Sequence, residues 1–277
     1  MKTFTVNLKD EYTFLQGGTL QAILEAMPFG GEAANWKRPA VIVVPGGGYS
    51  NVSPREAEPV ATAFMARGFH TFVLTYLCAP QGVRYPEQLL ELASAVDYVR
   101  KNAAEMNVNP DEIFVIGFSA GGHLTANLAI EYANVEQKAG VALDCKPTAI
   151  GLGYPVISKI HGHQGSYKNL LQGYSEAEES ELLKTLNLNE AVSDSTPPAF
   201  LWATAEDGAV PVDNTIRYAQ ALSDHGIAFE VHIYPKGVHG LSTCNHENNV
   251  ITPHLRRTSK WVDDCAAFFR LYVKEEF

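Results

Sequence analysis

The sequence predicts an α/β protein with a mostly parallel central β-sheet and helices on both faces. Stretches that are apolar throughout, as strands covered on both faces must be, alternate with stretches whose apolar residues recur at helical spacing. Turns rich in glycine and proline separate the two kinds of stretch. No repeat of fixed period and no low-complexity tract interrupts this alternation.

The strands are predicted from their apolar runs. Two opening strands are expected around Phe4 to Leu8 and Thr19 to Ala26, and the central sheet begins at the continuously apolar "AVIVV" of residues 40–44. The later strands are expected at "FHTFVLT" (69–75), "IFVIG" (113–117), "TAIGLGY" (148–154), "AFLWATA" (199–205) and "FEVHIY" (229–234).

Helix signals fill the intervals between these strands. "SPRE" (Ser53 to Glu56) combines an N-cap serine, a proline at the first helical position and a glutamate three residues after the cap, which predicts a helix running to about Gly68. Leucines and valines recur at helical spacing after Pro86. Further helices are expected after Gly121, over "PVDNTIRYAQALSDHG" (211–226) and over residues 258–274.

A longer excursion occupies residues 155–197, between two predicted strands. It is too long for a simple connection, and "SEAE" at Ser175 has the pattern of a capping box. We expect a small lid here, inserted into a single domain that comprises residues 1–277. Its helical stretches are short and are interrupted by glycines and charges, so they lack the long apolar face with which a lipase meets lipid.

Composition excludes several classes of function. The formal net charge is -10, with 31 acidic and 21 basic residues, and the basic residues are scattered, so nucleic acid is not an expected partner. No segment approaches the roughly 18 apolar residues of a membrane span, and the first residues do not form a signal peptide, so a cytoplasmic protein is expected. The four cysteines are far apart without C-x-x-C spacing, which favours reduced, structural thiols.

The stretch "IFVIGFSAGGH" (113–123) encloses one serine between small residues, after a buried strand and before a helix. A sharp strand-to-helix turn needs small residues on either side because the backbone folds back on itself, and it exposes the serine at the carboxyl edge of the sheet. The pentapeptide G-x-S-x-G is a weak signal alone. Its position between strand and helix makes Ser119 the candidate nucleophile.

A serine nucleophile needs a base, and the base needs an acid that orients it. Asp207 follows the strand at 199–205, and His239 follows the last strand, so the order Ser119, Asp207, His239 places all three at carboxyl ends of strands. Glu206, adjacent to Asp207, is a rival acid. Asp213 is another, although the dipole of the helix that begins there accounts for a carboxylate at this position.

The other histidines are weaker candidates for the base. His232 lies inside a predicted strand and His123 lies in the first turn of a helix, so both are expected to pack rather than to catalyse. "HGHQGS", from His161 to Ser166, could suggest metal ligation, but no third ligand accompanies it at a suitable spacing. No metal site is therefore predicted, and this stretch is expected to be a lid loop near the mouth of the pocket.

"VVPGGGYS" (43–50) is the second diagnostic stretch. Acyl transfer needs preorganised donors for the oxyanion, and three glycines after a buried strand let a loop turn its amides toward the nucleophile. We expect Gly47, Gly48 and Ala120, the residue after the serine, to supply these donors. The alternative, a dinucleotide loop of the form G-x-G-x-x-G, is disfavoured because Asn51 stands where the third glycine belongs.

On these motifs the sequence resembles the α/β-hydrolase superfamily, and within it bacterial lipase/esterase and acetyl-xylan-esterase-like proteins related to the hormone-sensitive-lipase group. The blocks that carry the resemblance extend over almost the whole chain: "VVPGGGYSNVSPREAEPVA", "GFSAGGHL", "YPVIS", "TPPAFLWATAEDGAVPVDN" and "YPKGVHGLS". The resemblance implies hydrolysis of carboxylic esters through an acyl-serine, without a cofactor. Where the group has H-G-G-G, this sequence has Pro45 in place of the histidine. In the group that histidine supports the loop, so its replacement bears on the geometry of the loop, and Gly46 is kept as an alternative donor.

The function expected from these observations is that of a serine carboxylesterase for short-acyl, acetyl-type esters of small alcohols, sugars or aryl alcohols. An arylformamidase or small amidase with the same triad is the alternative among enzymes. A non-catalytic ligand-binding protein on a hydrolase scaffold is the alternative from another class. The expected partner is a small-molecule ester, and the sequence leaves assembly into a homo-oligomer open.

Overall fold

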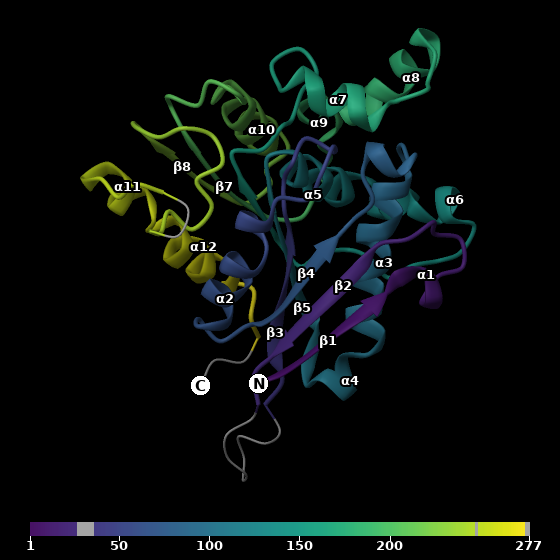
Figure 1. The fold of residues 1–277 in the computed structure, drawn as a ribbon, viewed down its shortest axis with the longest axis vertical. Coiled ribbons are helices and arrows are strands. Elements are labelled where there is room, and N and C mark those ends of the chain that lie inside the picture. Colours follow the sequence, from purple (N-terminus) through teal and green to yellow (C-terminus); the bar gives the residue numbers. More distant parts are fainter. Residues whose placement is uncertain (27–35, 247–248, 275–277) are drawn as a thin grey trace.

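The structure is a computed structural model. In the residues that it describes, 1–26, 36–246 and 249–274, eight strands form one sheet in the order β1-β2-β4-β3-β5-β6-β7-β8 (Figure 1). Pairing is antiparallel between β1 and β2 and between β2 and β4, and every other pair is parallel. The predicted fold class is confirmed.

Each predicted strand is present. The bounds are β1 Lys2–Asn7, β2 Thr19–Leu24, β3 Arg38–Val44, β4 His70–Thr75, β5 Val108–Phe118, β6 Ile150–Gly153, β7 Ala199–Thr204 and β8 Phe229–Tyr234. The main difference concerns β5, which begins at Val108 rather than at Ile113, because Val108 already pairs with Arg38 ahead of a register shift. The central strands β3 and β5 lie side by side, so the loops that follow them meet at one edge of the sheet.

Buried side chains form two clusters, one on each face of the sheet. Helices α3 (Glu87–Lys101), α5 (Ala120–Glu131) and α10 (Asp213–Asp224) contribute to one, and α2 (Glu58–Met65) and α12 (Trp261–Arg270) to the other (Figure 1). The other helices are α1 Leu8–Glu11, α4 Ala103–Met106, α6 Val135–Ala139, α7 Gln164–Leu170, α8 Glu176–Leu186, α9 Leu188–Ala191 and α11 Pro253–Thr258, with short 3-10 turns at Pro54–Glu56, Ala79–Gln81 and Tyr132–Asn134.

The predicted start of the helix at Ser53 is wrong. Residues Pro54–Glu56 form a 3-10 turn, Ala57 breaks it with φ -94° and ψ -107°, and α2 begins only at Glu58. Ser53 makes no capping hydrogen bond through its side chain. Glu56 does not reach back to the cap either, because its carboxylate accepts hydrogen bonds from Gly46 and Tyr154 instead.

Residues 155–197 connect β6 to β7 and contain α7, α8 and α9 (Figure 1). The capping box predicted at Ser175 is confirmed: Ser175 Oγ accepts the Glu178 N–H, and Glu178 Oε2 accepts the Ser175 N–H at 2.8 Å. The leucines of the segment are turned inward, four of them fully buried: Leu170, Leu171, Leu186 and Leu188. Within this segment, all of which the structure describes, Ile160 alone exposes a large apolar side chain.

Two further features bear on the expectations from the sequence. Among the helices of residues 1–26, 36–246 and 249–274, none has both the length and the apolar character needed to cross a membrane. The four cysteines are buried and unpaired. Burial raises the pKa of Cys78, Cys145 and Cys244 to about 12, so these thiols stay protonated near neutral pH.

Glu91 in α3 is fully buried, and its Oε2 accepts the Leu77 N–H at 2.8 Å. Burial raises the pKa of this carboxyl to about 8. The folded protein therefore favours the protonated form, whereas the unfolded chain ionises near the ordinary 4.5, so stability is lost as pH rises from about 4.5 to about 8.

Glu91→Gln is expected to remove this pH dependence, because glutamine imitates the protonated carboxyl and still accepts the Leu77 N–H. Its Tm should equal that of the wild type at pH 5 and exceed it by about 5 °C or more at pH 9. Thermal unfolding across this range, with the exposed Glu105→Gln as control, measures the effect. A Tm difference that does not change with pH would contradict this explanation.

Candidate active site

Ser119 occupies a sharp turn between β5 and α5. Its backbone has φ 53° and ψ -120°, a conformation that non-glycine residues rarely adopt. Three backbone hydrogen bonds hold the turn: Ser119 N–H donates to Gly153 O at 3.0 Å, and Ser119 O accepts the N–H groups of His123 (3.0 Å) and Val156 (3.1 Å). The strain is thus held by β6, by the helix and by the start of the 155–197 segment.

The glycines on either side of Ser119 have a steric reason. A Cβ on Gly117 would lie 2.2 Å from Gly121 O, and a Cβ on Gly121 would lie 2.2 Å from Val44 O. Both distances are far below van der Waals contact, so the first turn of α5 could not approach β5 and β3 with larger residues. This is the packing requirement that the G-x-S-x-G pattern predicts.

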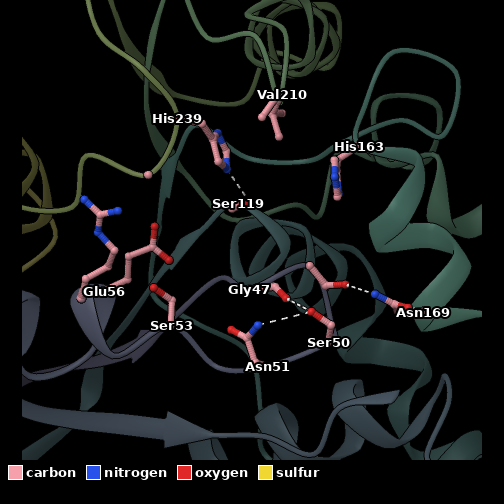
Figure 2. A pocket seen from close by; sticks show the side chains of 14 residues that line it. Gly47, Ser50, Asn51, Ser53, Glu56, Ser119, His163, Asn169, Val210 and His239 are labelled. Atoms are coloured by element: carbon pink, nitrogen blue, oxygen red, sulfur yellow. Dashed lines mark hydrogen bonds between the residues drawn. The ribbon is translucent and has the colours of Figure 1, made fainter. Parts of the chain in front are cut away.

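The three residues expected from the sequence form a continuous chain of hydrogen bonds. His239 Nδ1 and Asp207 Oδ2 are 2.6 Å apart. On the other side of the ring, His239 Nε2 and Ser119 Oγ are 2.8 Å apart (Figure 2). Asp207 is 6% exposed, and its Oδ1 accepts the N–H groups of Ala209 and Val210, each at 2.9 Å. With Oδ1 occupied in this way, Oδ2 is fixed toward the imidazole and selects the tautomer whose Nε2 accepts the serine proton.

The rival acids have other partners. Glu206 is paired with Lys236 at the surface, which lowers the pKa of its carboxyl. The side chain of Asp213 is 41% exposed and pairs with Arg217. It also lies 3.2 Å from His161 Nδ1. The structure therefore brings Asp207, and neither alternative, to the histidine.

The rival histidines are engaged as well. His123 is fully buried, with Nδ1 2.9 Å from Tyr49 Oη and Nε2 3.1 Å from Leu186 O. Burial lowers the pKa of His123 to about 4, so the ring is neutral and joins α5 to the end of α8. His232 pairs with Glu230 on β8.

The glycine loop after β3 holds its peptide groups in defined directions. Ser53 N–H donates to Gly46 O at 2.9 Å, and Ser50 donates to Gly47 O through N–H (3.0 Å) and hydroxyl (2.8 Å). Because the C=O and N–H of a trans peptide point in opposite directions, these bonds fix the N–H groups of Gly47 and Gly48. In the described part of the chain no hydrogen bond engages either N–H, and both glycines line the pocket of Ser119.

Ala120, the third predicted donor, is the first residue of α5. Amides in the first turn of a helix have no partner within the helix, so its N–H is available at the nucleophile. Gly46, the alternative donor, is differently placed: its N–H donates to Glu56 Oε2 at 2.8 Å. Pro45, which replaces a histidine of the related group, is held through its carbonyl, which accepts the Tyr76 hydroxyl at 2.9 Å.

A pocket of about 380 Å³ opens above these residues. In Figure 2, His239 and His163 stand on opposite sides of Ser119, and polar side chains occupy much of the remaining wall. The lining residues are Gly47, Gly48, Ser50, Asn51, Ser53, Arg55, Glu56, Ser119, His163, Asn169, Ala209, Val210, His239 and Gly240.

Ten of the fourteen lining residues were not predicted as site residues, among them His163, Asn169 and Glu56. His163 and Asn169 come from the 155–197 segment, and Asn169 Nδ2 donates to Gly48 O at 2.8 Å. His163 Nδ1 accepts the Ser166 N–H at 3.2 Å, which caps α7. Glu56 was assigned to a helix cap. The local sequence carries no signal for the contacts of Asn169 with Gly48 and of Glu56 with Tyr154, since each joins segments distant in the chain.

Comparisons with known proteins show which proteins the chain resembles. The chain is 32% identical over 248 residues to the acetylxylan esterase of Xylanibacter ruminicola, and 37% identical over 216 residues to endo-1,4-beta-xylanase B of Butyrivibrio fibrisolvens. These matches cover 86% and 76% of the chain but 46% and 34% of the relatives, so the chain spans less than half the length of either one.

Solved structures resemble the chain over nearly its full length. The acetyl ester-xyloside bifunctional hydrolase of Caldicellulosiruptor lactoaceticus has a TM-score of 0.81 at 31% identity, with 97% of this chain and 96% of that one covered. An α/β-hydrolase from a deep-sea metagenome has a TM-score of 0.76 at 30% identity, with 99% of each chain covered. The BD-FAE family profile matches residues 30–222. Because that match exceeds half of the 277 residues, the chain belongs to the BD-FAE family and has the α/β-hydrolase fold.

Proposed function

We propose that the protein is a serine carboxylesterase that hydrolyses short-acyl esters, with Ser119, His239 and Asp207 as its catalytic triad. The observation that carries the proposal is the hydrogen-bonded chain from Asp207 through His239 to a strained serine that lines the pocket. The similarity to proteins named acetylxylan esterase and acetyl ester-xyloside hydrolase supports ester hydrolysis as the reaction.

In the proposed mechanism, Ser119 Oγ attacks the ester carbonyl while His239 Nε2 accepts its proton. The charge that develops on the carbonyl oxygen is stabilised by the N–H groups of Gly47, Gly48 and Ala120. The imidazolium, held by Asp207, then protonates the leaving alcohol and an acyl-serine forms. Water repeats the cycle in the second half, and collapse of the second tetrahedral intermediate releases the acid and restores Ser119.

The pocket favours a small acyl group and a polar alcohol. Its volume of about 380 Å³ lies at the lower end of the ~300–1,000 Å³ typical of ligand pockets. Hydroxyl, amide and imidazole groups line it, so a sugar alcohol would find hydrogen-bond partners there. We therefore propose acetyl-type esters of sugars or small aryl alcohols as substrates.

Residues 155–197 are proposed to cover this pocket as a lid that belongs to the same domain. Asn169 bonds Gly48, and His163 faces Ser119 across the pocket, so the segment forms one wall of the site (Figure 2). Its leucines are packed inward, and an exposed apolar face for lipid is absent from this fully described segment. This arrangement supports an esterase rather than a lipase.

Acyl length is expected to have a strong effect on turnover. A methylene that fits the pocket contributes about 0.8 kcal/mol, but one that displaces the wall costs more. Among aryl esters, kcat/KM should therefore be highest for acetate and fall at least about tenfold by octanoate. A steady rise to octanoate, or a jump in activity at an emulsion interface, would replace this proposal with that of a lipase.

Matched substrates separate the esterase from the amidase alternative. An aryl acetate and the corresponding aryl acetamide differ only in the leaving group. The same is true of an aryl formate and the corresponding aryl formamide. We expect hydrolysis of the esters to exceed that of the amides by several orders of magnitude in kcat/KM. Comparable rates on the formamide would make the arylformamidase the better description.

A further inference from the structure

Glu56 lies at the junction of the glycine loop and the loop that carries His239. It is 3% exposed, it lines the pocket, and each of its carboxylate oxygens accepts a hydrogen bond from a different loop. Gly46 N–H donates to Oε2 at 2.8 Å, and the Tyr154 hydroxyl donates to Oε1 at 2.7 Å. Two donors on two oxygens match an ionised carboxylate, which is an acceptor only.

Tyr154 carries this connection to the histidine. Its hydroxyl accepts a hydrogen bond of 3.0 Å from the N–H of Ser242, a residue that lies three positions after His239. Its ring packs edge-on against the His239 imidazole, with the ring centroids 4.9 Å apart. Tyr154 is fixed from the other side by its own N–H, which donates to Trp202 O at 2.7 Å. The hydroxyl thus donates to Glu56 and accepts from the histidine loop at the same time.

The hydrogen bond from Gly46 N–H to Glu56 holds the loop that carries the oxyanion donors. Gly46 directly precedes Gly47, and a Cβ on Gly46 would lie 2.8 Å from both Glu56 Oε2 and Ser119 Cβ, so the loop, the carboxylate and the nucleophile are in close contact. A change in the bond to Gly46 N–H would therefore move the peptide groups that follow it. Among the described residues, Gly46 N–H and the Tyr154 hydroxyl each donate a hydrogen bond to Glu56 and to no other acceptor.

From this geometry we infer that Glu56 is a positioning residue for the reaction: through Gly46 and Tyr154 it holds the oxyanion donors and His239 at a fixed separation around Ser119. The inference rests on the proposed function. Glu56 itself makes no bond to the reacting atoms. Its effect is on the transition state, because displacing donors or base by a fraction of an ångström weakens interactions that the substrate ground state does not use.

Two substitutions test the two ends of the connection. Glu56→Gln keeps the size of the side chain but places an amide N–H₂ against one of two donors. Tyr154→Phe removes the hydroxyl and keeps the ring against His239. Glu58→Gln, an exposed carboxylate two residues away, is the matched control. Each protein is assayed on an aryl acetate, with active sites counted by titration with an organophosphonate.

For Glu56→Gln we expect kcat per titrated site to fall 10- to 100-fold with KM within about threefold, and for Tyr154→Phe a smaller fall of the same kind. Affinity for an aryl trifluoromethyl ketone, whose serine adduct carries an oxyanion, should fall in parallel with kcat/KM. The double variant should lose less than the product of the two single losses, because both act through one connection. Glu58→Gln should match the wild type.

Other outcomes would overturn the inference. If the substitutions lower only Tm or the titratable fraction, with kcat per site and ketone affinity unchanged, Glu56 has a structural role and no effect on positioning. If Glu56→Gln fails to fold, an unchanged kcat per site in Tyr154→Phe likewise rules out the positioning role. Failure of the proposed function is a separate result: the wild type would then not be titrated by the phosphonate at all.

Discussion

Replacing either Ser119 or His239 by alanine is expected to lower kcat on an aryl acetate by on the order of 10⁴-fold or more. Without Oγ no acyl-serine forms, and without the imidazole nothing accepts the proton across the 2.8 Å contact. The double variant should be little worse than either single variant, because the two groups act as one unit.

The folded state should survive both substitutions. Ser119 is held by its backbone, through the bonds to Gly153, His123 and Val156, and alanine retains all three. His239 is 23% exposed and can be truncated without a closed cavity. Far-ultraviolet circular dichroism and Tm verify this point. Turnover in Ser119→Ala within tenfold of the wild type would exclude Ser119 as the nucleophile.

Asp207→Asn is expected to lower kcat by on the order of 10³- to 10⁴-fold, whereas Asp213→Asn should change it by less than about twofold. The oxygen of an asparagine would stay with the N–H groups of Ala209 and Val210, so its N–H₂ would face His239 Nδ1 at this 2.6 Å contact. Nδ1 would then accept a hydrogen bond, and the imidazole would lose the tautomer whose Nε2 accepts the serine proton. Asp213 pairs with Arg217 at the surface and does not contact His239.

Steady-state kinetics of the two asparagine variants, with Glu206→Gln as a third, compare the three carboxylates that the sequence offered as the orienting acid. Glu206 is exposed and pairs with Lys236, so its variant should resemble the wild type. A larger loss in Asp213→Asn or Glu206→Gln than in Asp207→Asn would assign the acid to that residue instead.

The sequence predicted those parts of the protein that depend on local pattern. Strand patterns identified every strand of the sheet, with a continuous apolar run for β3, and the chain order of Ser119, Asp207 and His239 placed them at the same edge, where the structure joins them by hydrogen bonds. Short-range geometry explains this success, because the strand-to-helix turn and the loops after β7 and β8 are each set by the residues next to them.

Long-range contacts decided what the sequence could not predict. The same S-x-x-E pattern occurs at Ser53 and at Ser175, yet it forms a capping box only at Ser175. At Ser53 the glutamate is drawn to Gly46 and Tyr154, and Tyr154 is 98 residues from Glu56 in the chain. For the same reason the contact of Asn169 with Gly48, 121 residues away in the chain, was not predictable.

The most direct test of the central claim is the site of covalent labelling. The protein is treated with an aryl phosphonate that mimics an acetyl ester, its residual activity is followed, and the labelled peptide is identified by mass spectrometry. We expect one phosphonyl group per chain, carried by Ser119, with activity lost in proportion to labelling and no label in Ser119→Ala. Loss of activity with the label on another residue, or full activity after Ser119 is labelled, would contradict the assignment of Ser119 as the nucleophile.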